Sequence, residues 1–184
     1  MIDNNMIEAV IAEMGSCFAG YNECFCNSRD AFLTQLRLYV SETDKCLEAA
    51  IIAGLGNNTF DHNFGFNSAY PGGVFFSTNF EQKYTVVADF GKGIRQTLLS
   101  VLPSISSDAE ALEIAFTRKI SGRAPEQRGN GLNFISENIQ RNGWHLYFQS
   151  GFGSCSIDGE GINFSERAKP ISGCLAILDF NGDS

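Results

Sequence analysis

Three short polar stretches of this sequence carry residue types and spacings that point to chemistry. The first contains Asp89, Gly91, Lys92, Gly93 and Ile94, between a predicted strand and a predicted helix. A carboxylate at a strand end can accept a hydrogen bond from an exocyclic amine, and glycines let the backbone turn and a flat ring approach closely. An N-capping aspartate at an ordinary strand–turn–helix junction explains the same residues equally well.

The second stretch consists of Arg128, Gly129, Asn130, Gly131 and Leu132, and it leads into another predicted helix. Unpaired amides at a helix N-terminus, preceded by glycines and an arginine, form a cradle for an anion such as phosphate. Taken alone, the stretch is equally typical of an ordinary glycine loop.

The third stretch runs from Asn58 to His62, at the end of a predicted helix. The spacing of Asn58, Asp61 and His62 predicts that all three side chains share one side of the helix end. The asparagine offers a neutral oxygen to a hard cation such as Mg²⁺, whose other ligands would be waters and phosphates. A polar helix terminus, with His62 at the negative end of the helix dipole, is the simpler interpretation of this stretch alone.

Together, and in the chain order Asn58–His62, Asp89–Ile94 and Arg128–Leu132, the three stretches resemble the GHKL superfamily, which includes gyrase, MutL, histidine-kinase catalytic domains and serine-kinase anti-sigma factors. The resemblance covers residues 44–180 and is strongest to stand-alone histidine-kinase-like ATP-binding domains, through Asp89-Phe-Gly-Lys-Gly-Ile94 and the later Gly129-Asn-Gly-Leu132. It implies a Bergerat-type fold, a two-layer α/β sandwich, with ATP and Mg²⁺ as the ligands.

The resemblance also implies roles for individual residues. Asn58 would hold the Mg²⁺ ion that bridges the phosphates, and Asp89 would bind the adenine amine. Gly91 and Gly93 would pass beside the ring. The other candidates for contact with the nucleotide in these stretches are Asp61, Lys92, Ile94, Arg128, Asn130 and Leu132.

The glycine stretch and the segment before it would close over the phosphates. By the same resemblance, Gly129 and Gly131 present their amides to the phosphates, and residues 95–127 form the lid. Arg123 and Arg128 are the lid cations expected near phosphate, although a solvated side chain is the simpler fate for Arg123.

Two departures from the family pattern bear on catalysis. Many relatives that hydrolyse ATP or transfer phosphate carry a basic glutamate four residues before the metal-binding asparagine, and Gly54 stands there in this chain. His62 and Asp61 are weak candidates for the catalytic base. The family often has a Gly-Thr pair in a late strand near adenine, for which the nearest match is Gly173-Cys174. The pattern therefore supports nucleotide binding better than turnover.

Three functions remain open from the sequence. The first is a phosphotransferase or ATPase in signal transduction that acts on a partner protein, since residues 1–43 contain no histidine to serve as an internal phosphoacceptor. The second is a non-catalytic module in which ATP changes a protein-binding surface, and the third is a degenerate fold without nucleotide. Titration with ATP and Mg²⁺ separates the third function from the other two.

Composition excludes several other classes. With 13 basic and 21 acidic residues in 184, the formal charge of −8 argues against a general nucleic-acid-binding protein, but leaves room for a local cationic site for a small anion. We find no cationic leader and no apolar run near the about 20 residues of a membrane-spanning helix. We therefore expect a cytoplasmic protein without a membrane partner, whose six cysteines are mostly reduced.

The elements that must position these residues follow from apolar periodicity. Helices are predicted over residues 1–14, 28–39, 44–60, 94–102, 108–119 and 132–141, and strands over 74–79, 84–89, 144–149 and 174–180. This order predicts a two-layer α/β sandwich, with helices on one face of a mixed, mostly antiparallel sheet. Residues 1–43 would be a helical extension that packs on or flanks an ATP-binding domain of residues 44–184.

Overall fold

The computed structural model describes residues 2–19, 24–62, 72–118 and 131–181, and these ranges contain six helices and five strands. In chain order they are α1 (Asn4–Ala19), β1 (Phe25–Cys26), α2 (Arg29–Thr43), α3 (Cys46–His62), β2 (Val74–Asn79), β3 (Tyr84–Asp89), α4 (Gly93–Leu98), α5 (Asp108–Thr117), α6 (Gly131–Arg141), β4 (His145–Asp158) and β5 (Gly161–Asp179).

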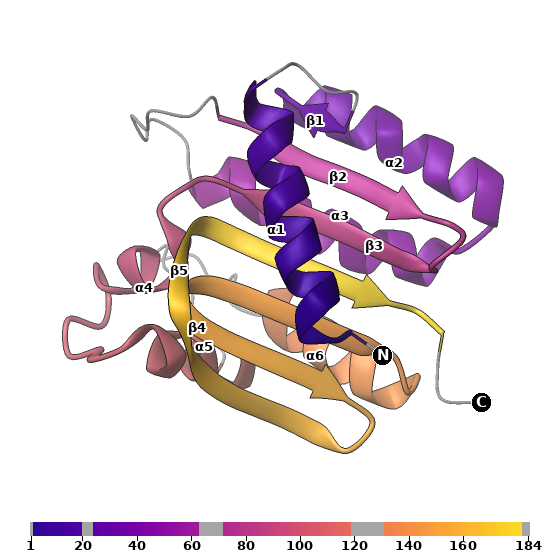
Figure 1. Cartoon of the computed structure of the whole chain (residues 1–184). Coiled ribbons are helices and arrows are strands. Elements are labelled where there is room, and N and C mark those ends of the chain that lie inside the picture. The colour runs from indigo at the N-terminus through magenta and orange to yellow at the C-terminus, as the bar shows by residue number, and fades with distance from the viewer. Residues whose placement is uncertain (1, 20–23, 63–71, 119–130, 182–184) are drawn as a thin grey trace.

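The strands form one sheet in the order β1-β2-β3-β5-β4, with every neighbouring pair antiparallel (Figure 1). β2 and β3 are joined by a tight turn, and β3 pairs along its whole length with the last part of β5. In this register Asp89 lies opposite Cys174, so the predicted adenine carboxylate and the nearest match to the Gly-Thr pair are neighbours in the sheet.

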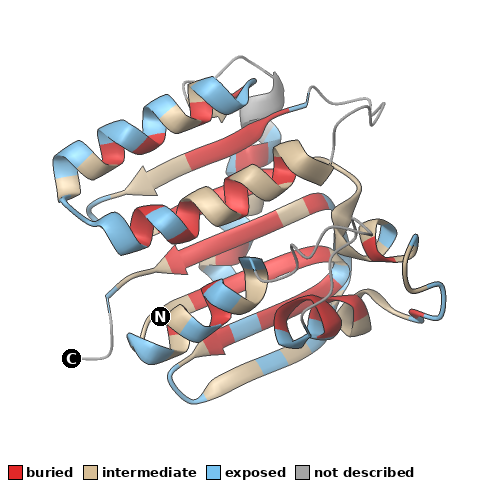
Figure 2. Ribbon diagram, turned by 180° about the vertical axis from the view of Figure 1, so that it is seen from behind, coloured by how far each residue is buried: buried red, intermediate tan, exposed pale blue. Residues whose placement is uncertain are grey.

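The larger core lies between the sheet and the helices α2, α3, α5 and α6, which cover one of its faces (Figure 2). Apolar side chains at alternate strand positions, such as Phe76 and Phe148, point to this face and meet Phe32 and Phe116 from the helices. The expected two-layer α/β sandwich is therefore confirmed, with a sheet that is antiparallel throughout the described strands.

α1 is the one described helix on the opposite face of the sheet, where it crosses the strands (Figure 1). The alternate strand positions are also apolar, including Phe75, Tyr147 and Ile177, and α1 buries them with Ile7 and Val10. Helices were expected on one face of the sheet only, and α1 on the second face differs from that expectation. The packing of residues 2–14 onto the domain was expected. Both faces of the sheet need a helix because both carry apolar side chains.

The N-terminal region as a whole is part of these cores. α2 contributes Phe32, Leu36 and Tyr39 to the same cluster that contains Ile51 and Ile52 of α3. Ser28 caps its start, with the Ala31 amide donating to the Ser28 hydroxyl oxygen at 3.2 Å.

The last two strands are much longer than predicted. Residues 144–149 and 174–180 are only their ends, and the intervening residues form an antiparallel hairpin between β4 and β5 with irregular register near Ser150 and Gly151. The glycines and polar residues of 150–173 obscure alternation in the sequence, and much of this part of β5 is exposed. A ladder of backbone hydrogen bonds joins the two strands of this hairpin, and Cys155 and Ile157 of β4 anchor it in the larger core.

Candidate nucleotide site

Asp89 ends β3 and is buried, with 6% of its surface exposed. Among the hydrogen bonds of its carboxylate, Thr59 Oγ1 donates to Oδ2 at 2.9 Å, and the Gly91 amide donates to Oδ1 at 2.7 Å. These bonds come from α3 and from the turn after β3, so they fix the carboxylate between the two elements. A buried carboxylate without such partners would be strongly unfavourable.

A pocket of about 480 Å³, including space open to solvent, lies beside Asp89. Its walls come from six elements, from α3 to β5. The lining residues are Leu55, Asn58, Thr59 and His62 of α3, Val87, Ala88 and Asp89 of β3, Gly93, Ile94 and Thr97 of α4, Leu132 of α6, and Phe148, Cys174 and Ala176 of the sheet. The pocket is therefore mainly apolar, with a few polar groups, a composition typical of small-molecule sites.

The loop after β3 is held against β5 by hydrogen bonds around Ser150. The Ile94 amide donates to Ser150 Oγ at 2.9 Å, and that hydroxyl donates to the Gly173 carbonyl at 3.0 Å. Gly93 and Gly173 both have φ near +75°, a conformation that favours glycine. Gly93, which was predicted to lie beside the ring, thus has a backbone conformation that favours glycine, and Gly93 lines the pocket.

The start of α6 brings the second motif to the third. A Cβ atom placed on Gly131 would lie 3.9 Å from both terminal atoms of the Asn58 side-chain amide, and Leu132 lines the pocket. Arg128, Gly129 and Asn130, together with Arg123 and residues 119–127 of the expected lid, lie outside the described residues.

The side chains at the end of α3 do not all face the pocket as predicted. Asn58 and His62 line it, whereas the Asp61 carboxylate lies 2.6 Å from the Arg29 guanidinium of α2. The same guanidinium donates to Asn57 and stacks over the Phe60 ring. The expectation that Asp61 contacts the nucleotide is therefore not supported by its position, because an arginine from another helix holds it elsewhere.

Gly91 and Lys92 lie on the other side of the same loop. They line a neighbouring cavity with Arg95 and Asp108, and Gly93 is the residue that borders both spaces. Of the residues in the Asp89 motif, Asp89, Gly93 and Ile94 thus face the candidate site directly.

Thr59 and Thr97 are polar pocket residues to which the sequence assigned no role, and Cys174 was noted only as part of the nearest match to the Gly-Thr pair. Thr59 lies within the Asn58–His62 stretch, but its hydrogen bond to Asp89 depends on how α3 crosses β3. Burial raises the pKa of the Cys174 thiol well above its ordinary value, and the negative charge of Asp89 raises this pKa further. Cys174 is consequently a neutral thiol in the pocket wall.

Thiol labelling should distinguish Cys155 and Cys174 from Cys46, the exposed cysteine among those whose side chains the structure describes. Because the thiolate is the reactive form and burial raises the pKa of both Cys155 and Cys174, we expect iodoacetamide at pH 8 to modify the exposed Cys46 at least about tenfold faster than either. Peptide mapping by mass spectrometry measures the rates. In urea the three rates should become similar, and equal rates in the native protein would contradict the described burial.

No protein-family model matches the sequence, and no curated protein matches it significantly. Within the described ranges, each helix is too short or too polar to cross a bilayer. The same residues contain no group of three or more His, Cys, Asp or Glu side chains placed to hold a metal ion.

Proposed function

We propose that this chain binds ATP together with Mg²⁺ in the pocket beside Asp89, as a GHKL-type domain, and acts as a phosphotransferase or ATPase on a partner protein. The observation that carries the proposal is the meeting of the three motifs: Asp89, Asn58 and Leu132 line one pocket although they are far apart in the sequence.

The pocket suits a purine better than a polar sugar. Its apolar residues, among them Ile94, Leu132 and Ala176, offer contact to a flat ring, and Asp89 offers carboxylate oxygens to an exocyclic amine. Adenine presents an amine where guanine presents a carbonyl oxygen, so a carboxylate favours adenine and repels guanine.

The phosphates and the metal would lie toward the start of α6. Asn58, close to Gly131, supplies the amide oxygen that would hold Mg²⁺. One protein oxygen suffices for this ion, because Mg²⁺ usually keeps several waters and takes further oxygens from phosphates. When bound, the ion would neutralise phosphate charge, and the amides at the helix start would add to this effect.

Transfer to a partner would depend on positioning and electrostatics, as phosphoryl transfer generally does. The described residues that line the pocket include His62 one helical turn beyond Asn58, which stays the weak candidate for a base. We propose that the acceptor lies on another protein.

A nucleotide-gated interaction module is the second candidate function, and Gly54 favours it. A Cβ atom at position 54 would lie 3.4 Å from Ile135, so this position faces α6 one turn before Asn58 without offering a carboxylate. Replacement of Gly54 by glutamate should generate ATPase activity if the site is otherwise complete. An unchanged low rate would argue for the module.

Calorimetric titration tests the binding proposal. We expect ATP with Mg²⁺ to bind and GTP to fail, and we expect ATP at a hundred times its dissociation constant to stabilise the fold by about 2.7 kcal/mol. Omission of Mg²⁺ should lower the affinity for ATP more than it lowers the affinity for ADP. Absence of heat and of any melting-temperature shift at millimolar Mg-ATP would contradict both candidate functions.

A further inference from the structure

A second pocket lies at the other end of α3 and β3 from the candidate nucleotide site. Its volume is about 810 Å³ including space open to solvent, and its lining residues are Tyr39, Thr43, Lys45, Glu48, Thr78, Asn79, Phe80, Lys83, Thr85, Phe180 and Asn181. Glu48 and Asn58 are ten residues apart on α3, or about 15 Å along the helix axis, so the two pockets are separate.

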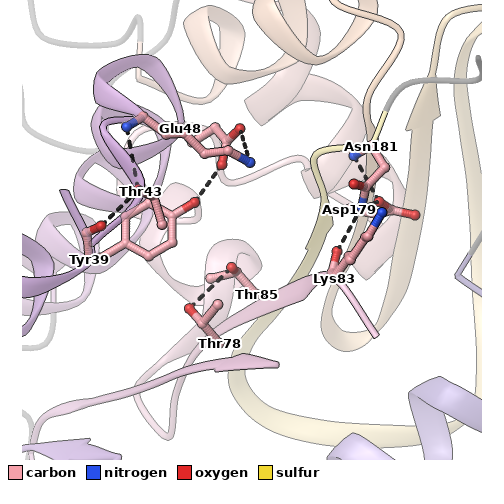
Figure 3. Close-up of polar contacts among 9 residues, drawn as sticks. Tyr39, Thr43, Glu48, Thr78, Lys83, Thr85, Asp179 and Asn181 are labelled. Carbon is pink, nitrogen blue, oxygen red and sulfur yellow. Dashed lines mark hydrogen bonds and ion pairs between the residues drawn. The ribbon is translucent and has the colours of Figure 1, made fainter. Parts of the chain in front are cut away.

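One wall of this pocket holds a buried carboxylate with two partners. Glu48, only 6% exposed, accepts a hydrogen bond from the Tyr39 hydroxyl and pairs through Oε1 with the Lys45 ammonium at 3.0 Å (Figure 3). Burial, and then the bond to Glu48, raises the pKa of Tyr39, so its phenol stays a proton donor. The pair fixes the Lys45 ammonium at the pocket, and this group has two further N–H donors.

The opposite wall contains Lys83, whose backbone is in an unfavourable conformation for lysine. Its φ is +60°, a region that glycine and asparagine adopt far more readily. Its carbonyl accepts a bond from Asn181 Nδ2 at 3.1 Å, and the same amide donates to Asp179, which anchors the turn (Figure 3). A lysine at this position carries a backbone cost that glycine would avoid, and its side chain lines the pocket.

Two hydroxyl groups and two aromatic rings complete the site. Thr78 Oγ1 and Thr85 Oγ1 are 3.3 Å apart, and only 2% of the Thr85 surface is exposed. Only one of their two protons can lie between them, so the second can be donated to a ligand. Phe80 is 57% exposed and Phe180 is half-buried, and both offer apolar surface at the same pocket.

The charges select the class of ligand. Two lysines and one glutamate line the pocket, which gives a local charge of +1 in a chain whose formal charge is −8. The donors at the pocket are ammonium, hydroxyl and asparagine amide groups, all of which can donate to an oxyanion. We propose that this pocket is a second ligand site, for a small anion that carries an aromatic ring, with its oxyanion between Lys45 and Lys83 and its ring against Phe80.

Titration by NMR with simple probes tests the site. We expect benzoate and phenyl phosphate to shift the backbone amide signals of Thr78 and Thr85, with the same affinity in the presence of saturating Mg-ATP. The neutral analogue benzyl alcohol should bind at least fivefold more weakly, and benzylamine should not bind. Shifts confined to the surroundings of Asp89, or stronger binding of benzylamine, would overturn the proposal.

Substitutions at Lys83 separate binding from folding. Lys83→Gln should lower the affinity for benzoate at least fivefold. The matched control Lys169→Gln, at an exposed position of β5, should leave this affinity unchanged. Lys83→Gly should lower the affinity for benzoate by the same factor and leave the melting temperature unchanged, because glycine readily adopts the positive φ. Unchanged benzoate affinity in both Lys83 variants would overturn the proposal, whatever the outcome of the ATP titration.

Discussion

Replacement of Asp89 by asparagine is expected to lower the affinity for ATP at least tenfold, or about 1.4 kcal/mol in binding free energy. The carboxylate is the proposed partner of the adenine amine, and asparagine removes its charge and half of its acceptor atoms. The amide NH₂ would also face a present donor, Thr59 Oγ1 or the Gly91 amide, so the free energy of unfolding should fall by about 1–3 kcal/mol.

The control for Asp89→Asn is the same substitution at Asp30, an exposed residue in the first turn of α2. Asp30→Asn should leave both the calorimetric affinity and the unfolding transition nearly unchanged. Calorimetry must be done at a temperature where the Asp89 variant is folded, as judged by circular dichroism. Full ATP affinity in a folded Asp89→Asn protein would contradict the adenine role of this carboxylate.

Replacement of Gly173 by alanine is expected to reduce the free energy of unfolding by about 3 kcal/mol or more. Gly173 has φ of +75°, and a Cβ atom there would overlap the Asp89 carbonyl and lie 2.6 Å from the Asp89 carboxylate oxygen Oδ1. The backbone of β3 cannot move away without breaking the sheet, so the Asp89 carboxylate should also shift. Loss of ATP affinity should accompany the loss of stability.

Gly143→Ala separates the conformational part of this effect from the steric part. Gly143 has φ of +63°, but a Cβ atom there meets nothing within 4 Å. Alanine at this position should reduce stability by only about 1–2 kcal/mol and leave ATP affinity intact. Urea unfolding measures both variants. Equal losses would show that crowding against Asp89 is unimportant.

The local features of the site were predictable because each depends on residues close together in the chain. The strand before Asp89 and the turn that requires Gly93 lie within one short segment, and the spacing of Asn58 and His62 places both on one side of α3. Helix periodicity also predicted α3 and α6 close to their observed bounds.

The position of Asp61 was not predictable, because its direction depends on a residue from another helix. Helical spacing allows it to share a face with Asn58, but Arg29 of α2 is close enough to bind its carboxylate. The ion pair with Arg29, whose guanidinium also contacts Asn57 and Phe60, directs the Asp61 carboxylate toward α2.

Sequence alone was thus enough to establish the α/β class, most of the helices and three motifs with the same proposed ligand. The folded arrangement established which of their side chains share a pocket, that α1 covers the second face of the sheet, and that Glu48, Lys83 and Thr85 surround another pocket. The physical reason is the range of the forces: backbone preference and periodicity act within a few turns of chain, whereas burial and ion pairing act between whichever surfaces the packing brings together.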